Sequence, residues 1–495
     1  MRKYLIPQTE IRNRHPKGMV SYTDGDYSNF ASLLIEAIKE TGIRDLGDEL
    51  LTEIAINLTM YYEDVIADAC IWRGFTDKVH EMYGKYLPFY DLDEEEYMRD
   101  EPNIEDIRFV IWNTLSMSRF PQGRIVNPET PAIIIMAKVA YELMDKWFEK
   151  IPVNEELKDF FVKAKFLDNL YEMRDVLKWI SFHCYLTYMP NHVKKIIDYA
   201  NDYSLFFDNN HDVAYYAAES ALPYEEKVGP LALYAPEWLG IILRANGLEK
   251  EALDVERQEQ KPLDIYKIVK AERGKGVEFE NAIGEIFYVT DEKLGNPAAE
   301  HYESKTALGA FVKYRGSWYL NAAIIWSPEG MELFEITKKD VERKARLRKF
   351  DYDKLMATSG GSPFFYFENY QKMADFLTNE GGLSRERLKE FKIEDKNDRF
   401  LLMVSSKEDF SILYGNKVEC CLKDVRNPYY DENVAKRDSL VFAFKLPGNL
   451  LKYAMDGNML PHAQLNSCYG SDRGKALFRE NYDFFLRATM RVDYQ

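Results

Sequence analysis

Three carboxylates in one short segment are the residues best placed to do chemistry. They are Glu63, Asp64 and Asp68. Asp64 and Asp68 are four residues apart, which places both on one face of a helix, where like charges need a cation, a basic partner or solvent. A Mg²⁺ ion binds one or two carboxylates and keeps several waters. We therefore take all three as candidate acid–base residues and Asp64 and Asp68 as candidate metal ligands. A solvated or arginine-paired helix face is the alternative.

The other catalytic motifs that we sought in the sequence are incomplete. The segment Gly470–Ala476 resembles a phosphate-binding loop, but it is one residue short and Ala476 replaces the Ser or Thr that would hold Mg²⁺. The sequence has neither a Gly-x-Ser-x-Gly nucleophile motif nor a His-Glu-x-x-His zinc motif. No cofactor is identified from these patterns.

A basic run over residues 338–349 is the candidate nucleic-acid surface. Basic faces attract phosphate backbones by releasing counterions. The whole chain, however, has 65 Lys and Arg against 82 Asp and Glu, a net charge of −17 that opposes association with nucleic acid. A helix docked on the chain's own acidic groups is the alternative that this total favours. The candidate residues are Lys338, Lys339, Arg343, Lys344 and Arg346.

Cysteine usage and hydropathy predict a cytoplasmic protein without a membrane segment. The five cysteines show no Cys-x-x-Cys spacing, which disfavours a disulfide framework or a cysteine-rich zinc site. The longest compact apolar run, Ala132–Ala137, is far shorter than the roughly 20 residues that span a bilayer. Cys420 and Cys421 stand in a segment typical of a strand, which would direct the two thiols to opposite faces.

The elements that must position these residues fall into three regions, and we expect an α+β fold. Residues 1–260 are predicted to be mainly helical. Apolar side chains recur every three or four residues from Leu51 to Trp72, which predicts one amphipathic helix. Residues 132–148 and 230–246 predict two more helices, and the polar stretch 254–261 is interpreted as a linker.

Residues 261–328 predict a small antiparallel β module, either barrel-like or a curled sheet. Its clearest signal is a pair of alternating runs over 311–326, flanking Gly316 and Ser317, a dipeptide suited to a tight hairpin turn. Residues 329–495 are predicted to form an α+β region, with strands at 399–405 and 410–414 and a helix over 474–492.

Seven segments spread along the chain are considered together: Tyr61–Asp64, Tyr86–Tyr90, Asn103–Ile107, Ala235–Leu239, Asp424–Tyr430, Met459–Ala463 and Glu480–Phe485. Together they resemble a bacterial family of uncharacterised intracellular proteins, a domain of unknown function. The resemblance covers most of the chain and implies no catalytic residue, because the family has no assigned activity.

Three functions follow as hypotheses. The leading one is an interaction or regulatory protein with a protein or small-molecule partner, because no catalytic motif is complete. The second is an enzyme of unrecognised type that uses the carboxylates Glu63, Asp64 and Asp68. The third is nucleic-acid binding through the basic run, which the net charge opposes.

Overall fold

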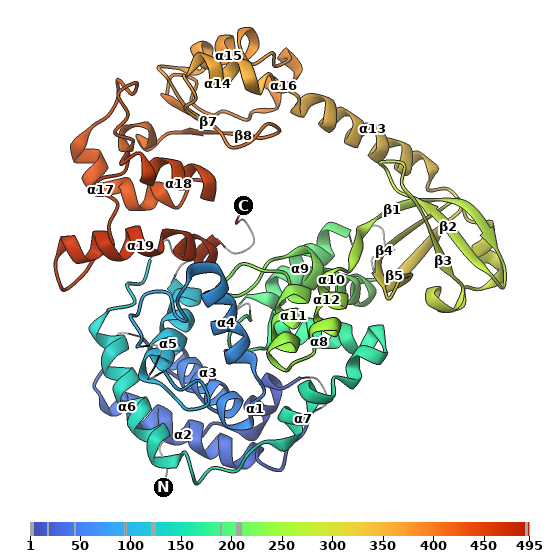
Figure 1. Ribbon diagram of the computed structural model, residues 1–495. Helices are drawn as coiled ribbons and strands as arrows, with labels where there is room; N and C mark the ends of the chain where they lie inside the picture. Colours follow the sequence, from blue (N-terminus) through green and yellow to red (C-terminus); the bar gives the residue numbers. More distant parts are fainter. Residues whose placement is uncertain are drawn as a thin grey trace. The chain divides into compact units, whose positions relative to one another are not determined.

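The computed structural model describes residues 4–16, 19–43, 46–93, 95, 97–119, 125–188, 191–203, 210–490 and 494. It confirms the α+β class and groups the chain into two compact units, a first unit of chiefly residues 1–331 and a second unit of chiefly residues 332–486 (Figure 1). The predicted division at residues 260 and 328 stays a prediction.

Twelve helices of the described chain form the larger part of the first unit (Figure 1). They are α1 (Gln8–Arg14), α2 (Asp24–Glu40), α3 (Asp48–Ala67), α4 (Ile71–Tyr83), α5 (Ile104–Arg119), α6 (Pro131–Trp147), α7 (Glu155–Lys163), α8 (Leu170–Phe182), α9 (His192–Tyr203), α10 (His211–Glu225), α11 (Ala235–Ala245) and α12 (Glu249–Glu256). The predicted helices at 132–148 and 230–246 correspond to α6 and α11.

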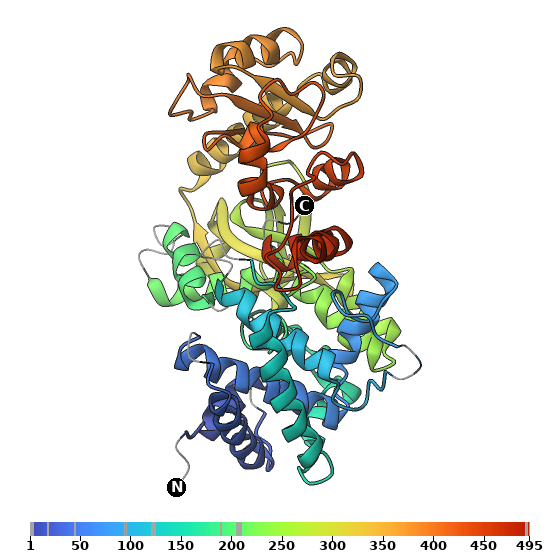
Figure 2. The same ribbon diagram turned by 90° about the vertical axis from the view of Figure 1, so that its left-hand side faces the viewer.

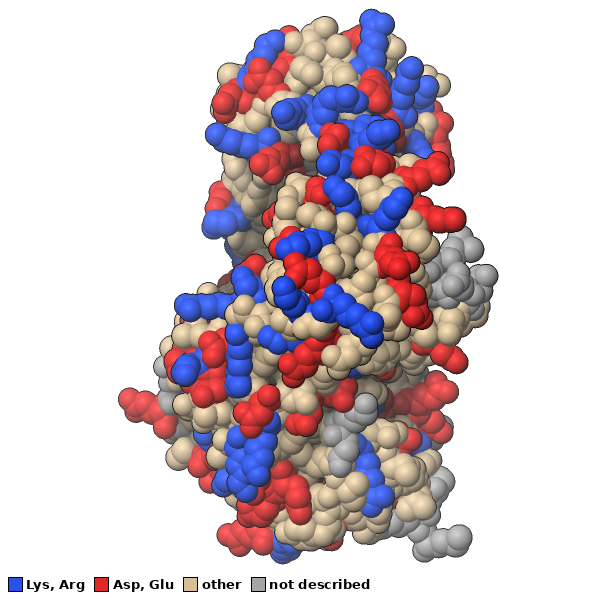
Figure 3. Space-filling view, turned by 90° about the vertical axis from the view of Figure 1, so that its right-hand side faces the viewer, with Lys and Arg blue, Asp and Glu red and all other residues tan. Residues whose placement is uncertain are grey.

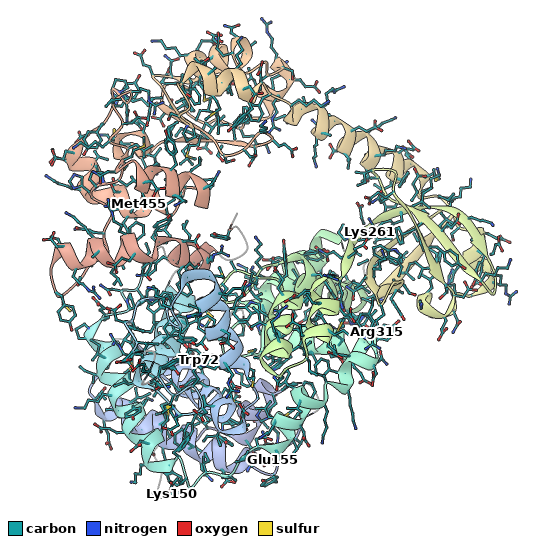
Figure 4. The ribbon with its side chains drawn as sticks, in the orientation of Figure 1. Trp72, Lys150, Glu155, Lys261, Arg315 and Met455 are labelled. Carbon is teal, nitrogen blue, oxygen red and sulfur yellow. The ribbon has the colours of Figure 1, made fainter. Side chains whose placement is uncertain are left out.

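Helix α3 is the centre of this bundle and contacts α1, α2, α4, α5 and α7. The single helix predicted from Leu51 to Trp72 is wrong, because α3 ends at Ala67 and Trp72 belongs to α4. The break falls at Asp68 and Cys70, which have left-handed φ values of 52° and 65°. Trp72, labelled in Figure 4, packs edge-on against Tyr61 with ring centres 5.0 Å apart, so apolar contacts continue across the break.

A five-stranded sheet completes the first unit. Its strands are β1 (Glu259–Glu272), β2 (Gly276–Glu280), β3 (Ile286–Thr290), β4 (Thr306–Tyr314) and β5 (Ser317–Ser327), in the order β3-β2-β1-β4-β5 with every neighbouring pair antiparallel. Short 3₁₀ turns flank it at Glu292–Leu294 and Ala299–Glu303, and another precedes α8 at Lys165–Asp168.

The sheet curls but does not close into a barrel within the described residues. Edge strands β3 and β5 come into contact without a hydrogen-bonded ladder, and the rings of Phe287 and Trp318 lie 5.1 Å apart between them. Aromatic side chains pack together inside the curled sheet, and their burial stabilises its curvature. They are Tyr266, Phe279, Phe287, Phe311, Trp318 and Trp326.

The β4–β5 hairpin turns one residue earlier than the sequence predicts. Tyr314 pairs with Ser317, so the turn residues are Arg315 and Gly316, with φ values of 46° and 81° (Arg315 is labelled in Figure 4). Positive φ at both positions defines the turn class that matches the twist of paired strands. Gly316 is suited to its place because it has no Cβ.

The stretch interpreted as a linker is instead the end of a helix and the start of a strand. Helix α12 ends at Glu256, and β1 begins at Glu259. The sheet also packs on α10, where Asn321 Nδ2 donates to the carbonyl of Ser220 at 2.9 Å. A buried hydrogen bond of this kind fixes the sheet against the helices.

The second unit combines helices with a three-stranded antiparallel sheet of order β6-β7-β8. Helix α15 packs on β6 and β7, and Figures 1 and 2 both show it on one side of this sheet. The elements are α13 (Met331–Arg348), α14 (Tyr352–Thr358), β6 (Phe364–Phe367), α15 (Tyr370–Asn379), α16 (Arg385–Glu390), β7 (Phe400–Val404), β8 (Phe410–Tyr414), η6 (Val418–Cys421), α17 (Glu432–Ala443), α18 (Gly448–Asp456) and α19 (Ser471–Met490).

The predicted strands at 399–405 and 410–414 are confirmed as β7 and β8, and α19 covers the predicted helix up to Met490; residues 491 and 492 lie outside the described part. The strand interpretation of Cys420 and Cys421 is wrong, because both lie in the 3₁₀ helix η6.

Candidate functional site

Glu63 lies in a buried cluster of charges. Its Oε2 accepts a hydrogen bond from His15 Nε2 at 2.8 Å, and its Oε1 accepts one from Asn154 Nδ2 at 2.7 Å. Asp24 Oδ1 lies 3.7 Å from Nδ1 of the same histidine, and Asp24 also pairs with Arg12. Two carboxylates thus face two basic groups, as buried charges require.

The electrostatics of this cluster raise the pKa of His15 above its ordinary value. Burial by itself lowers the pKa of a histidine, but the charge and hydrogen bond of Glu63, with the charge of Asp24, outweigh that effect and raise the pKa. The cluster therefore joins the end of α1 to α2 and α3 by ionic contacts, and to the start of α7 by the hydrogen bond from Asn154.

Asp64 has a different set of partners. It accepts hydrogen bonds from the backbone N–H groups of Ile71 at 3.1 Å and Trp72 at 2.7 Å, at the start of α4, and from the Tyr185 hydroxyl at 2.9 Å. Burial raises the pKa of Asp64 to about 6, and these hydrogen bonds oppose the rise. Asp64 thus satisfies N–H groups that the helix leaves unpaired.

Asp68, the third of the predicted carboxylates, has partners different from those of Glu63 and Asp64. It follows the last residue of α3, its side chain is half-exposed, and it pairs with Arg73 Nη2 at 3.0 Å. Among the residues that the structure describes, no group of three or more His, Cys, Asp and Glu side chains is arranged to hold a metal ion. The catalytic and metal roles of Glu63, Asp64 and Asp68 stay predictions.

Another buried carboxylate, Asp106, was missed by sequence reasoning. Asp106 accepts hydrogen bonds from Tyr97 at 2.8 Å and Tyr61 at 2.9 Å, and burial raises its pKa to about 7. Asn103, three residues earlier, also donates to it. Sequence spacing does not identify this site, because Tyr61 comes from α3, 45 positions earlier in the chain.

The first unit contains a cleft of about 1020 Å³ lined by parts of α1, α3, α5, α8 and α9. Arg14 lies in it, paired with Glu53 at 2.6 Å and with its guanidinium 4.8 Å from the centre of the Tyr188 ring. The volume is of the size that small-molecule sites have.

A second hollow of about 350 Å³ shares Asn13, Phe182 and His183 with this cleft. It also reaches His15 of the buried cluster. The combined site, which we call the histidine cleft, is lined by His15, His183 and His192, three of the seven histidines in the chain. No sequence pattern connects these residues, because they come from separate helices.

His183 is the histidine that lines both hollows. Its ring lies edge-on to that of His192, with centres 5.5 Å apart. Burial, followed by the charges of His192 and Arg14, lowers the pKa of His183 to about 4. The imidazole is therefore neutral at neutral pH and has one nitrogen free to accept a proton or a hydrogen bond.

The histidine cleft has an excess of acidic groups. Its cations are paired: Arg14 with Glu53, and Lys178 with Glu219 at 2.7 Å. Glu10 and Glu49 line the cleft and form no ion pair with any residue that the structure describes. A cleft with unpaired carboxylates beside aromatic rings attracts cations.

The candidate nucleic-acid residues lie on α13, and several pair with acids of the second unit. Asp340 contacts both Arg343 and Lys344, at 2.8 and 2.7 Å, and Arg343 also pairs with Glu390. Arg346 lies 3.7 Å from Glu386, Lys338 is half-buried and Lys339 is exposed. Figure 3 shows basic and acidic side chains interspersed on the face it draws. Nucleic-acid binding stays a prediction.

These features describe an α+β protein with a polar cleft in a helical bundle. The chain belongs to the family described as protein of unknown function (DUF3843), whose profile matches residues 6–258 and 315–491. The match confirms the resemblance seen in the sequence to a family without assigned activity. The unmatched stretch between the two ranges holds β1 to β4.

No curated protein and no solved structure matches the chain. No helix in the described ranges is long and apolar enough to cross a bilayer.

Proposed function

We propose that this chain is an interaction protein whose first unit binds a small organic cation in the histidine cleft. The observation that carries the proposal is the cleft itself, about 1020 Å³ in volume and lined by the carboxylates of Glu10 and Glu49, which form no ion pair with a described residue. Phe182 and Tyr188 also line the cleft, and the Tyr188 ring already has the Arg14 guanidinium over it.

The pairing of Arg14 supports the choice of a cation. The guanidinium lies over the Tyr188 ring and contacts Glu53, so an organic cation of the chain itself already uses one carboxylate and one aromatic ring of the cleft. Glu10 and Glu49 offer the same kind of carboxylate, and no cation in the described part of the chain pairs with them. An amine that enters the cleft gains two charge-assisted contacts there.

The contacts of the predicted catalytic carboxylates also support binding over catalysis. Both oxygens of Glu63 accept hydrogen bonds inside the fold, and Asp64 accepts three. Groups engaged in this way stabilise the native packing. The enzyme and nucleic-acid hypotheses remain alternatives to the proposal.

A cytoplasmic location is part of the same proposal. All five cysteines are free, and four of them are buried, as suits a reducing compartment.

Thermal denaturation in the presence of spermidine tests the proposal. A ligand that binds the folded chain alone raises its stability by about 2.7 kcal/mol at a concentration 100 times its Kd. We expect spermidine to raise the Tm of the wild-type chain at low salt and to have little effect on the E10Q/E49Q variant. The matched control is E142Q/E300Q, which changes two exposed glutamates of the same unit.

Equal Tm shifts in all three proteins would refute specific binding in the cleft, as would the lack of a shift in the wild-type chain. Because Glu10 and Glu49 lie in the first turns of their helices, the ligand-free Tm of each variant is the baseline for its own shift.

A further inference from the structure

The second unit has a hollow of its own, of about 480 Å³, between the loop that follows β8, the 3₁₀ helix η6 and helix α17. Its floor is apolar and buried, formed by Val418, Cys421 and Phe442, which are 6 %, 1 % and 2 % exposed. A concave apolar floor of this size is a general property of small-molecule sites.

The rim of this hollow is basic. Lys417, Arg437 and Lys445 line it together with a single acid, Asp438. Arg437 donates two hydrogen bonds to Asp438, at 2.9 and 2.6 Å, and this contact, with the charge of Lys445, lowers the pKa of the carboxyl. The only acid of the rim is therefore ionised and already neutralised by Arg437.

Two positive charges remain at the rim after this pairing. Lys417 and Lys445 are exposed, and neither forms an ion pair with a residue in the described part of the chain. Lys417 follows Asn416 in left-handed backbone, with φ values of 55° and 52°, immediately before η6. This conformation fixes where the Lys417 side chain leaves the loop.

We propose that this hollow binds a small organic anion, with a phosphate or carboxylate group at Lys417 and Lys445 and an apolar body on the floor. Charge complementarity selects the anionic group, because the rim has a surplus of two positive charges in a chain whose total is −17. The buried floor selects the apolar body, since an inorganic anion would leave it uncovered. The hollow shares no lining residue with the histidine cleft, so a failed test of one proposal does not affect the other.

Fluorescence titration with 1-anilinonaphthalene-8-sulfonate, an aromatic anion, tests the proposal on the full chain. We expect the K417Q/K445Q variant to bind this probe at least about tenfold more weakly than the wild-type chain. The matched control is K389Q/K392Q, which removes two exposed lysines of the same unit outside the hollow and should bind as the wild type does. Equal affinity in all three proteins overturns the proposal.

Competition identifies the chemistry of the anion. Competition with benzoate and with phenyl phosphate distinguishes a carboxylate ligand from a phosphate ligand. Displacement of the probe by either compound supports the site. Displacement by benzyl alcohol as efficient as by benzoate contradicts the role of the charge. Displacement by inorganic phosphate as efficient as by phenyl phosphate contradicts the role of the floor.

A second variant tests the rim charge in protein that is shown to be folded. K445E reverses one rim charge at an exposed position and should weaken binding further than K445Q does, while the melting temperature from circular dichroism stays near that of the wild type. Equal binding by K445E and K445Q in folded protein rejects an anionic ligand at this rim.

Discussion

His15 Nε2 and Glu63 Oε2 lie 2.8 Å apart in the interior of the first unit, although the two residues are 48 positions apart in the chain. The contact is almost fully shielded from water, since the two side chains are 1 % and 0 % exposed. A buried pair of this kind specifies where α1 meets α3, because either charge alone would be strongly unfavourable there.

Replacing Glu63 with Gln is expected to destabilise the chain by about 3–5 kcal/mol, because it leaves the buried His15 without its carboxylate. Since His15 binds its proton more tightly in the folded chain, its contribution to stability is complete below about pH 6.5 and is lost as the pH rises through the raised pKa. Urea unfolding from pH 6 to 9 should therefore show the wild type losing stability relative to E63Q. The control is H211Q at an exposed histidine, and parallel pH profiles for the wild type and E63Q would contradict the assignment.

Replacing Tyr185 with Phe removes one of the three hydrogen bonds to Asp64, so we expect a loss of roughly 1.5–3 kcal/mol, the range for hydrogen bonds to charged groups. The pKa of Asp64 should then rise further above about 6, which NMR titration measures. Tyr62→Phe is the comparison, because its buried hydroxyl donates to the neutral backbone carbonyl of Met144 and should cost only about 0.5–1.5 kcal/mol. Equal losses in both variants would mean that Asp64 is uncharged in the folded chain.

Two glycines of the β4–β5 hairpin should respond differently to alanine. Gly316→Ala is expected to destabilise the chain by about 1 kcal/mol, because φ at this position is 81°. Gly309→Ala lies in β4, where a new Cβ would meet its nearest neighbours at ordinary contact distances of 3.5 Å or more, and should change the free energy of unfolding little. Urea unfolding of both variants checks the turn, and a larger loss at Gly309 would contradict it.

Thiol reactivity should separate one cysteine from the other four. Cys468 is exposed, whereas the remaining four are buried. Burial also raises the pKa of Cys184 to about 11 and of Cys421 to about 12, which suppresses their thiolates. Ellman's reagent should therefore modify one thiol rapidly in the native chain and all five in denaturant, and Cys468→Ser should remove the rapid phase. A rapid phase that persists in this variant would show that a buried thiol is accessible.

Local patterns in the sequence were sufficient for elements whose signal is complete within one segment. The runs behind α6, α11, β7 and β8 have the period of their element and clear ends, so the helices and strands were predicted within a few residues. The break after α3 was not predicted, because Asp68 and Cys70 adopt left-handed φ without a glycine to signal it. Arg315 moved the hairpin turn by one residue for the same reason.

The candidate site depends on tertiary contacts, which no local pattern encodes. The segment around Glu63 and Asp64 looked like a pair of available carboxylates, but their partners His15, Asn154 and Tyr185 come from three other elements. The histidine cleft likewise joins α1, α8 and α9. Sequence spacing identified the residues with unusual chemistry, and packing determined how they are used.

The cluster at Glu63 also sets an order of events during synthesis. Asn154, which donates to Glu63, lies 91 residues further along the chain. At translation speeds of about 5–20 residues per second, roughly 5–20 seconds pass between the appearance of these two residues. The nascent chain therefore carries His15, Asp24 and Glu63 for that interval without the Asn154 amide, so the cluster is complete only after helices α1 to α6 have been made.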